Sequence, residues 1–263
     1  MALKQHLDDN VRYEQQVDNS REYVIPFIAQ TKPLGKGVRV LEIGCGEGGV
    51  LKPMIDMGCE CVGVDLNEIR IELSNKFLAD EVTAGKVEFL LKNVYDADFL
   101  DRFKGYFDII ILKDVIEHVP EQEKFIPYIK QLLRQDGQIF FGFPPWYMPF
   151  GGHQQTCRAK LASKLPYYHI LPKGIYKGLL KMMGEDPGII KDLMDIYDTR
   201  ITIERFERII KKSGLKVLNQ QHYLFNPIYR FKFGLKPRKQ LGLITHIPFF
   251  RNFVTTCVYY TVG

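Results

Sequence analysis

The sequence lacks the features that mark membrane-spanning, secreted and fibrous proteins. None of its 263 residues lies in a run of about 18 consecutive apolar residues, which a membrane-spanning helix requires. The N-terminal stretch MALKQHLDDN has no apolar signal core, so we expect no secretion. Internal repeats and low-complexity segments are also absent, and the hydrophobic (46%) and charged (25%) fractions are ordinary for a globular chain.

Cysteine is scarce in the sequence. The chain has five cysteines, an odd number that fits a reducing compartment, and we expect a cytoplasmic protein. Cys59 and Cys61 are two positions apart, which places both side chains on one face of a strand. No second cysteine pair and no histidine cluster completes a metal site in the sequence. We therefore expect buried, small apolar roles for these cysteines and no bound metal.

Acidic residues are missing from the end of the chain. From Arg208 to Gly263 there is no Asp or Glu, while ten Lys or Arg give this tail a charge of +10. The first 207 residues hold 26 basic and 31 acidic residues, a net charge of −5. Such an asymmetry suggests an anionic partner for the tail, such as phospholipid, a phosphorylated substrate or nucleic acid. A solvated basic face is the alternative, and both explanations remain open here.

Short apolar segments alternate with helical segments over the first 143 residues. Strands are expected at 38–43, 61–66, 87–91, 107–112 and 138–143, and helices at 11–31, 50–57, 67–82 and 122–133. Asn67 can cap the third of these helices, and Gly58 is a typical residue to end the second. The alternation predicts an α/β fold with a parallel sheet.

A glycine-rich segment follows the first expected strand. Glu42 is followed by Gly44, Gly46 and Gly48 in a G-x-G-x-G spacing, and glycine lets the backbone approach a ligand without a Cβ clash. Asp65 stands at the end of the second strand, where a carboxylate can accept both hydroxyls of a ribose. The loop, the acidic residue and the strand–helix alternation together predict a site for an adenosine-type cofactor.

At these positions the sequence resembles the class I S-adenosylmethionine-dependent methyltransferases. The matching segments are VLEIGCGEGG, VGVDLN, FDIIILKDVIEHV and LLRQDGQIFF, which lie in order and cover residues 38–143. The similarity is to the small-molecule branch that includes quinone-biosynthesis methyltransferases, where the fourth strand also runs into a Glu-His-Val ending. The resemblance implies a Rossmann-like, seven-stranded, mostly parallel sheet with helices on both faces and S-adenosyl-L-methionine as the cofactor.

The resemblance also assigns roles to individual residues. Gly44, Gly46 and Gly48 would wrap the methionyl part of the cofactor, Glu42 would stabilise their loop, and Asp65 would bind the ribose. The other residues expected at the cofactor are Cys45, Leu66, Asn93, Val94, Lys113 and Asp114. Of these, Leu66 would pack on the adenine, and the Val94 N–H would face it.

Two of these positions depart from the family pattern. Asn93 stands where the family often has an Asp near the adenine amino group, and it keeps a hydrogen-bonding side chain. Lys113 is unusual at the end of the fourth strand, and we expect its backbone carbonyl to contact the cofactor while its side chain points to solvent.

The chain divides into three parts of one domain. Residues 1–144 are the expected N-terminal helix and cofactor-binding half. The proline-rich segment after residue 143 cannot continue a strand. Residues 145–200 are the expected inserted cap. Residues 201–263 hold a helix at 203–212 capped by Thr202, strands at 216–224 and 254–262, and a basic, aromatic connection at 225–253. A connection of that length is usually functional or lid-like.

Methyl transfer needs a base only where the acceptor arrives protonated. His118, after the fourth strand, and His153, after the fifth, are the catalytic candidates, because imidazole titrates in the useful range. A purely structural role for the Glu117-His118 pair is the competing interpretation. His153 is placed on the substrate side, since it lies at the edge of the sheet where open α/β folds bind ligands.

Several other functions can be weighed from the sequence. NAD would also suit Asp65, but no Tyr-x-x-x-Lys pair lies where a short-chain dehydrogenase needs one. Nucleic-acid amino methylation would need an Asn/Asp-Pro-Pro-aromatic sequence after the fourth strand, where this chain has Leu112-Lys113-Asp114. We expect a small-molecule acceptor that is apolar, anionic or lipid-like, with the basic, aromatic tail touching an anionic membrane surface. An RNA methyltransferase and a catalytically inactive cofactor-binding partner protein are the alternatives.

Overall fold

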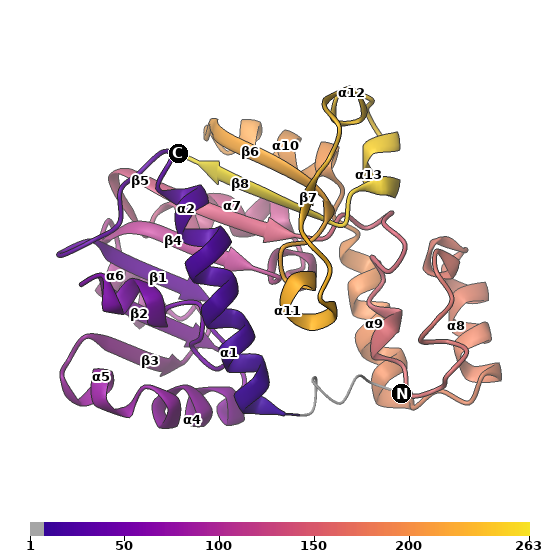
Figure 1. The fold of residues 1–263 in the computed structure, drawn as a ribbon, viewed down its shortest axis with the longest axis horizontal. Helices are drawn as coiled ribbons and strands as arrows, with labels where there is room; N and C mark the ends of the chain where they lie inside the picture. The colour runs from indigo at the N-terminus through magenta and orange to yellow at the C-terminus, as the bar shows by residue number, and fades with distance from the viewer. Residues whose placement is uncertain (1–7) are drawn as a thin grey trace.

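The fold is built around one eight-stranded sheet with strand order β3-β2-β1-β4-β5-β8-β6-β7 (Figure 1). The computed structural model describes residues 8–263. The expectation of no secretion depends on the N-terminal stretch MALKQHLDDN, and the first seven residues of that stretch lie outside the described residues. The strands are β1 (Arg39–Ile43), β2 (Glu60–Asp65), β3 (Val87–Leu91), β4 (Phe107–Lys113), β5 (Leu133–Phe143), β6 (Val217–Phe225), β7 (Arg238–Lys239) and β8 (Cys257–Val262). β1 to β5 pair in parallel, and β8 is antiparallel to both β5 and β6.

Two details of the predicted sheet are wrong. The prediction of seven strands is one short, because β7 adds two residues to the outer edge of β6 inside the segment expected to be a loop. The fifth strand begins at Leu133 and not at Gln138, because Leu133 already pairs with Phe107 across an irregular register. The helix before it is correspondingly shorter than expected.

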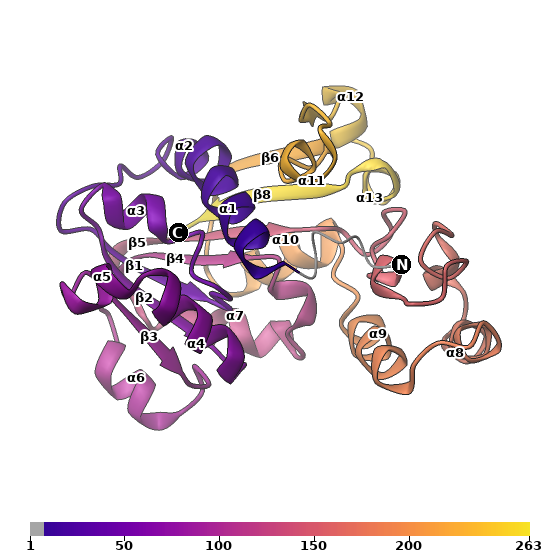
Figure 2. The same ribbon diagram turned by 60° about the horizontal axis from the view of Figure 1, so that its bottom comes forward.

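Helices cover both faces of the sheet (Figure 2). One face carries α1 (Asp9–Asn19), the π-helical turn η2 (Ser20–Val24), α2 (Ile25–Ile28), α3 (Lys52–Asp56), α4 (Glu68–Phe77) and α5 (Ala79–Thr83). The other carries α6 (Ala97–Phe103), α7 (Gln122–Lys130) and α10 (Ile203–Lys212). Asn67 and Thr202 cap α4 and α10 with their side chains, as the sequence predicts.

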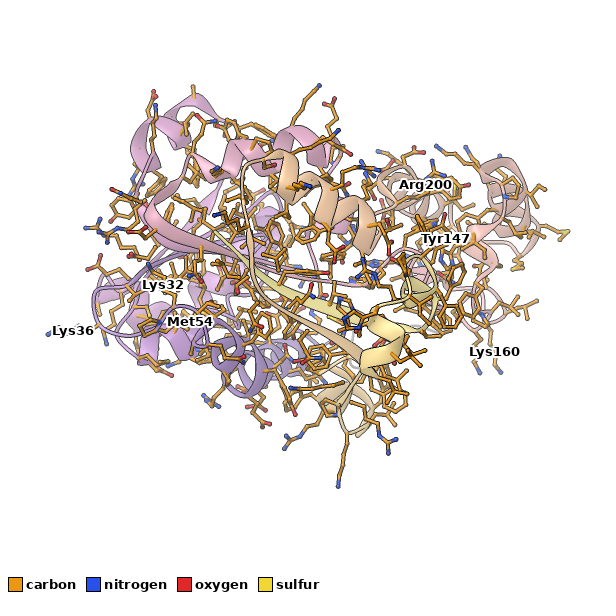
Figure 3. All side chains as sticks on the ribbon, turned by 90° about the horizontal axis from the view of Figure 1, so that it is seen from above. Lys32, Lys36, Met54, Tyr147, Lys160 and Arg200 are labelled. Atoms are coloured by element: carbon orange, nitrogen blue, oxygen red, sulfur yellow. The ribbon has the colours of Figure 1, made fainter. Side chains whose placement is uncertain are left out.

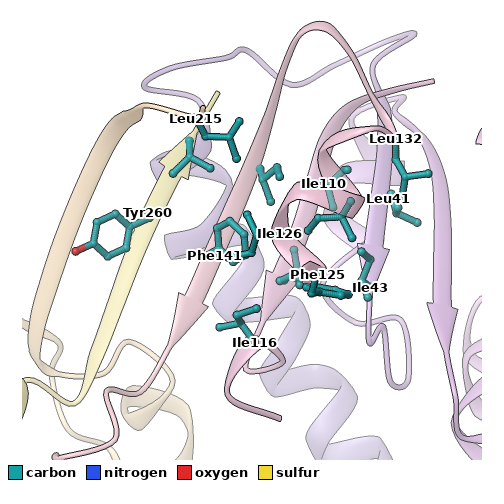
Figure 4. Packing of buried hydrophobic residues seen from close by; sticks show 14 of the residues in the cluster. Leu41, Ile43, Ile110, Ile116, Phe125, Ile126, Leu132, Phe141, Leu215 and Tyr260 are labelled. Atoms are coloured by element: carbon teal, nitrogen blue, oxygen red, sulfur yellow. The ribbon is translucent and has the colours of Figure 1, made fainter. Parts of the chain in front are cut away.

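The central strand β4 explains why the sheet needs both layers. Ile109 and Ile111 contribute to the apolar cluster on the α1–α5 face, while Ile110 and Leu112 contribute to the opposite cluster. Figure 4 shows part of this opposite cluster, with Ile110 labelled. All four side chains are fully buried. Alternating side chains on a strand point to opposite faces, so an unbroken apolar run requires cover on both sides.

The insertion after β5 has an apolar cluster of its own. It contains η4 (Gln154–Thr156), η5 (Tyr168–Ile170), α8 (Lys173–Met182) and α9 (Pro187–Thr199), which lie beside one end of the sheet (Figure 1). Trp146, Tyr176, Leu193 and Tyr197 are among the buried side chains of this cluster. The aromatic side chains of the insertion are therefore mostly core.

The connection between β6 and β8 is also ordered. It forms α11 (Tyr229–Phe233), β7, α12 (Gly242–Thr245) and α13 (Phe250–Val254). β6 runs in the same direction as β1 to β5, so this connection leaves the sheet at the edge where the parallel strands end. The short helix η3 (Ile116–His118) after β4 lies at the same edge.

Two global features complete the description. All five cysteines are free and buried, and Cys59 and Cys61 share the cluster on the α1–α5 face, as expected. Among the described residues, no helix is both long and apolar enough to cross a membrane.

Candidate active site at the carboxyl edge of the sheet

The glycine loop between β1 and α3 has the backbone that its spacing predicts. Gly44, Gly46 and Gly48 all have positive φ angles (70°, 53° and 80°). A Cβ on Gly44 would lie 2.6 Å from Val115, whereas a Cβ on Gly46 would meet only the Gln16 side chain, 3.9 Å away. Gly44 therefore permits close packing against the residue after β4, and Gly46 leaves one side of the loop open to a ligand.

Glu47 holds this loop in place, although the sequence analysis missed it. Its carboxylate is buried, pairs with Arg12 of α1 and Arg70 of α4, and accepts a hydrogen bond from Gln16 Nε2 at 3.3 Å. The two guanidinium groups come from helices on either side of the loop. An acidic residue inside a glycine-rich loop was the only available signal, and its partners are remote in the sequence.

Asp65 lies next to the loop, as predicted. One carboxylate oxygen accepts a hydrogen bond from the Gly46 N–H at 2.9 Å, and the other accepts one from the Asn67 N–H at 2.9 Å. The following residue, Leu66, leaves 73% of its side chain exposed. An apolar side chain standing free beside this carboxylate suits contact with a flat ring above a ribose.

The segment after β3 offers one free backbone donor. The Asn93 side-chain oxygen accepts a hydrogen bond from the Tyr95 N–H at 3.0 Å, and the Asn93 N–H donates to Asp96 at 3.1 Å. Among the described residues, the N–H of Val94 makes no hydrogen bond. The Val94 N–H is thus not used by a hydrogen bond within the described residues, so its predicted role as a backbone donor stays a prediction, while the Asn93 side-chain oxygen is already bonded within the local turn.

Glu42 is a buried carboxyl without a complete set of partners. It is 2% exposed, and its Oε2 atom makes no hydrogen bond with any of the described residues. Burial raises the pKa of Glu42 well above its ordinary value, against the lowering influence of Lys113. A cationic ligand beside the glycine loop would satisfy this atom. Together with Asp65 and the open side of Gly46, this orphaned oxygen fits a positively charged, ribose-bearing cofactor.

Cys45 faces the core. Its Sγ atom lies 2.9 Å from the position that a Cβ on Gly63 would take, and its N–H donates to the Val64 carbonyl at 3.1 Å. The side chain therefore packs against β2, and the predicted contact of Cys45 with the cofactor stays a prediction.

Lys113 corrects the expectation drawn from the sequence. Its side chain is 7% exposed and does not point to solvent, because its ammonium group forms an ion pair with Asp114 Oδ2 at 2.6 Å. Burial alone would lower the pKa of Lys113, but the Asp114 carboxylate raises it above its ordinary value. Asp114 has a left-handed backbone (φ 56°), which turns the chain sharply after β4. A charged pair therefore lies where the strand meets the glycine loop.

The two predicted catalytic histidines meet in space. The rings of His118 and His153 have centroids 4.9 Å apart at a steep angle of 74°. His153 Nε2 also lies 3.8 Å from Glu117 Oε1. Burial and the neighbouring His118 lower the pKa of His153 to about 3, and burial lowers the pKa of His118. Both rings are neutral at pH 7 and each keeps a nitrogen that can accept a proton.

Glu117 lies beneath the histidine pair. Its side chain is buried, and within residues 8–263 neither carboxyl oxygen has a hydrogen bond. Burial raises the pKa of Glu117 well above its ordinary value, and the nearby Asp114 adds to this effect. Glu117, His118 and His153 each offer one potential ligand atom, and these atoms all lie within 4.8 Å of one another. Nitrogen and carboxylate ligands of this kind suit a divalent transition ion. The fold thus brings together a histidine cluster that is not visible in the sequence, while the expectation of no bound metal stays a prediction.

The loop that carries His153 is tightly packed. A Cβ on Gly151 would overlap the Trp146 carbonyl, and a Cβ on Gly152 would lie 2.5 Å from the His169 side chain. The buried His169 donates from Nε2 to the Trp146 carbonyl at 2.7 Å, so its Nδ1 accepts from Gln154 at 3.0 Å. The two glycines are therefore required by close approach within the protein itself, and this contact holds His153 (φ 56°) over Glu117.

Lys232 brings the basic tail into the site, and the sequence analysis did not single it out. It lies on α11 and is half-buried, and within the described part of the chain its ammonium has no ion pair or hydrogen bond. Burial lowers the pKa of Lys232, and the nearby Asp114 opposes this. Alternating aromatic and basic residues were the available signal, but only the folded helix shows which lysine turns inward.

α11 is attached to the N-terminal helix. Gln15 Nε2 donates to the Phe231 carbonyl at 3.3 Å, and the Tyr23 and Phe231 rings meet edge to face. Arg230 pairs with Glu22 and donates to Tyr23 Oη at 3.1 Å. This contact places α11 and α1 over the same edge of the sheet as the glycine loop.

A cavity of about 450 Å³ adjoins the histidine pair. Its lining comes from three segments: His118, His153 with Thr156, and the α9 residues Ile189, Asp192, Leu193, Asp195 and Ile196. Tyr147, at the base of the insertion and labelled in Figure 3, stacks on Phe253 with ring centroids 5.1 Å apart. The insertion and the β6–β8 connection thus meet around the acceptor side of the site.

Comparison with known proteins matches the part of the chain that contains the glycine loop and the two histidines. A family model described as a methyltransferase domain matches residues 13–163. The ubiquinone biosynthesis O-methyltransferase of Rhizobium etli is 25% identical over 200 residues, covering 75% of this chain and 67% of its own. The mitochondrial mouse protein of that name is 31% identical over 198 residues, covering 74% of this chain and 46% of its own. The Aromatoleum aromaticum protein is 32% identical over 105 residues, which are 40% of this chain and 43% of its own.

The chain thus spans less than half the length of the Aromatoleum and mouse relatives. Solved structures share its fold at lower identity. A geranyl diphosphate methyltransferase in complex with GPP and sinefungin has a TM-score of 0.57 at 15% identity, covering 90% of this chain and 74% of its own. A putative sarcosine dimethylglycine methyltransferase from Galdieria sulphuraria has a TM-score of 0.59 at 12% identity, covering 92% and 83%.

Proposed function

The chain belongs to the family of S-adenosylmethionine-dependent methyltransferases, and we propose that it methylates an oxygen atom of a small, amphiphilic acceptor that carries negative charge. One observation carries this proposal. Val115 packs against Gly44 of the glycine loop, so the group of Lys113, Asp114, Glu117 and His118 begins directly beside the expected cofactor site.

The cofactor side of the site is made by Asp65, Glu42, Gly46 and Val94. Asp65 would accept the ribose hydroxyls, the Val94 N–H would face the adenine, and Glu42 would meet positive charge on the methionyl part. Bound S-adenosyl-L-methionine supplies a methyl group on a sulfonium, and S-adenosyl-L-homocysteine is the product. The protein's task is therefore to orient the acceptor oxygen in line with the methyl group.

The histidine pair supplies the proton acceptor. A hydroxyl that attacks a methyl group must lose its proton, and a neutral imidazole within reach can take it. His118 lines the cavity, and the His153 ring meets it edge to face and is fixed by its loop. We propose that His118 accepts the proton and that His153 orients it. The names of the sequence relatives, which are O-methyltransferases, support oxygen as the acceptor atom.

Lys232 supports the negative charge of the acceptor. An ammonium that is half-buried, with Asp114 near it but no partner in hydrogen-bond contact, can gain a full ion pair only from a ligand. The apolar residues of α9 that line the cavity, such as Leu193 and Ile196, would receive the apolar part of the same molecule. Its negative charge would lie toward Lys232 and away from the two aspartates of that lining, Asp192 and Asp195.

The test has a binding arm and a turnover arm. Calorimetry should show that S-adenosyl-L-homocysteine binds with a dissociation constant below the high micromolar range. Absence of binding would overturn the cofactor assignment. Turnover is measured as S-adenosyl-L-homocysteine release with paired acceptors, 4-methylcatechol and 3,4-dihydroxybenzoate. Faster turnover of the carboxylate is expected. Binding without release for any small acceptor would favour a catalytically inactive partner, and release only with RNA would favour the RNA methyltransferase alternative.

A further inference from the structure

An exposed apolar arm projects from the sheet beside the acceptor side of the site. We define the arm as residues 240–254, which include α12 and α13 (Figure 1). Leu241 is 69% exposed, Leu243 79% and Phe249 69%, and Ile247 and Phe250 are exposed as well. Five large apolar side chains within ten residues form a concentrated apolar tip, unlike the single exposed apolar residues that any surface carries.

The base of this arm is firmly anchored. Arg251 pairs with Glu204 at 2.8 Å and with Glu207 at 2.7 Å, both on α10. The fully buried Asn252 donates to Glu204 at 2.7 Å and accepts a hydrogen bond from the Ile203 N–H at 2.9 Å. Because the base is held by buried polar contacts, the exposure of the tip is a built feature and not the fraying of a loop.

Phe249 is presented to solvent at a cost in backbone energy. Its φ angle is 62°, a left-handed value that is uncommon for a bulky residue, and its N–H donates to Glu204 Oε1 at 2.9 Å. Strained backbone persists where surrounding contacts enforce it, often at sites that bind something. Here the strain points an aromatic ring away from the protein.

The flank of the arm carries positive charge alone. Lys236, Arg238 and Lys239 directly precede the arm and are exposed, and the chain contains no acidic residue after Glu207. Arg251 is already neutralised by Glu204 and Glu207, so the free charge is that of the flank. Apolar and aromatic side chains next to unpaired basic residues match the chemistry of an anionic lipid surface.

The position of the arm connects this surface to the acceptor. β6 ends and β8 begins at the edge of the sheet where the parallel strands end. Tyr167 Oη donates to the Phe253 carbonyl at 3.0 Å, which ties the arm to the insertion that carries His153. A surface that touches the tip would therefore lie beside the acceptor cavity.

We propose that the arm docks the protein onto anionic membrane surfaces, with Leu241, Leu243 and Phe249 entering the interface and Lys236, Arg238 and Lys239 contacting the lipid phosphates. Docking of this kind requires no catalysis, so it goes beyond the proposed function. It would also present an amphiphilic acceptor to the active site from the bilayer.

The experiment is co-sedimentation with vesicles of phosphatidylcholine and phosphatidylglycerol in equal amounts, compared with pure phosphatidylcholine. Wild type should bind the anionic vesicles at low salt and be released at high salt. The double variant Leu243→Glu/Phe249→Ser should bind at least tenfold more weakly. The triple variant Lys236→Gln/Arg238→Gln/Lys239→Gln should lose most of the salt-dependent binding.

Matched controls change residues of β6 and α10 at the ends of these elements that lie far from the arm. Leu218→Glu changes an apolar residue that is 44% exposed at the start of β6, on the opposite edge of the sheet. Lys211→Gln/Lys212→Gln removes two charges of the same acid-free tail from the last turn of α10. Both controls should bind vesicles within twofold of wild type. Unchanged S-adenosyl-L-homocysteine affinity in every variant separates this result from the proposed function.

A fluorescent probe gives an independent measure of insertion. Trp146 is the single tryptophan of the chain and is 3% exposed, so Leu243→Trp adds a distinct signal at the tip. Brominated lipids should quench this new signal. The proposal is overturned if wild type stays in the supernatant with anionic vesicles, if the arm variants bind like wild type, or if quenching is absent. It is also overturned if sedimentation velocity shows the arm holding two copies of the chain together without vesicle binding.

Discussion

The cofactor side and the acceptor side of the site are built in different ways. The cofactor side, residues 39–94, uses backbone turns and single side chains at the ends of three neighbouring strands, such as Gly46, Asp65 and Val94. The acceptor side gathers side chains from remote segments: Glu117 and His118 after β4, His153 after β5, and Lys232 on α11. Short local motifs thus suffice for the cofactor, whereas the acceptor site depends on how whole segments pack.

The largest expected contrast between the two sides is their response to acid. His153, His169 and His222 have pKa values lowered by burial to about 3, about 4 and about 4, and all lie outside the cofactor side. A histidine with a lower pKa in the folded state contributes stability that is complete above about pH 6.5 and lost as the pH falls. The loss should approach about 1.4 kcal/mol per pH unit for each histidine.

Glu42 on the cofactor side has the opposite dependence. Its pKa is raised by burial, so its contribution to stability is lost as the pH rises through the folded-state value. Hydrogen exchange between pH 7 and pH 5 should therefore show residues 145–199 losing protection before β1 to β3. Equal loss on both sides, or earlier loss in β1 to β3, would contradict the contrast.

The second prediction concerns a substitution that should impair the cofactor side alone. Asp65→Ala removes the carboxylate beside Gly46 and should weaken S-adenosyl-L-homocysteine binding by about 10- to 100-fold, since hydrogen bonds to charged groups contribute about 1.5–3 kcal/mol. Calorimetry measures it. Glu60→Ala, at the other end of β2, is the control and should bind normally. Wild-type affinity for Asp65→Ala would mean that the ribose lies elsewhere.

The third prediction concerns a substitution that should impair the acceptor side alone. Gly151→Ala forces a Cβ into the Trp146 carbonyl and should lower the free energy of unfolding by about 1–3 kcal/mol. Urea unfolding measures the loss, and the folded protein should keep its S-adenosyl-L-homocysteine affinity while turnover falls. Gly178→Ala of α8 is the control, because no atom lies within 4 Å of its Cβ and alanine favours helix. Equal stability of both variants would show that the loop can move.

The smallest effect is expected at the charge of the acceptor. Lys232→Gln should raise KM for 3,4-dihydroxybenzoate by about fivefold, equivalent to about 1 kcal/mol for a partly exposed ion pair. It should leave KM for 4-methylcatechol and the cofactor affinity unchanged. Lys212→Gln removes a charge far from the site and serves as the control. An equal rise in KM for both acceptors would assign Lys232 a structural role.

The predictions that held were those that depend on neighbouring residues. Residues close together in the sequence are enough to predict several features. These are the left-handed turns at Gly44, Gly46 and Gly48, the caps at Asn67 and Thr202, and the boundaries of β3. The failures involve the way side chains pack once the chain is folded. Lys113 was expected in solvent, but a left-handed turn at Asp114 brings a carboxylate back onto it.

The sequence by itself determined the alternation of strands and helices, the glycine loop with its acidic partner, and the family of the protein. These depend on periodicity and spacing, which the linear chain states directly. Only the tertiary structure decided that His118 and His153 touch, that Glu117 is left without hydrogen bonds, and that Lys232 turns inward while the α12–α13 arm turns out. The physical reason is that parallel strands bring distant segments to one edge, and side-chain burial there depends on every segment packed around it.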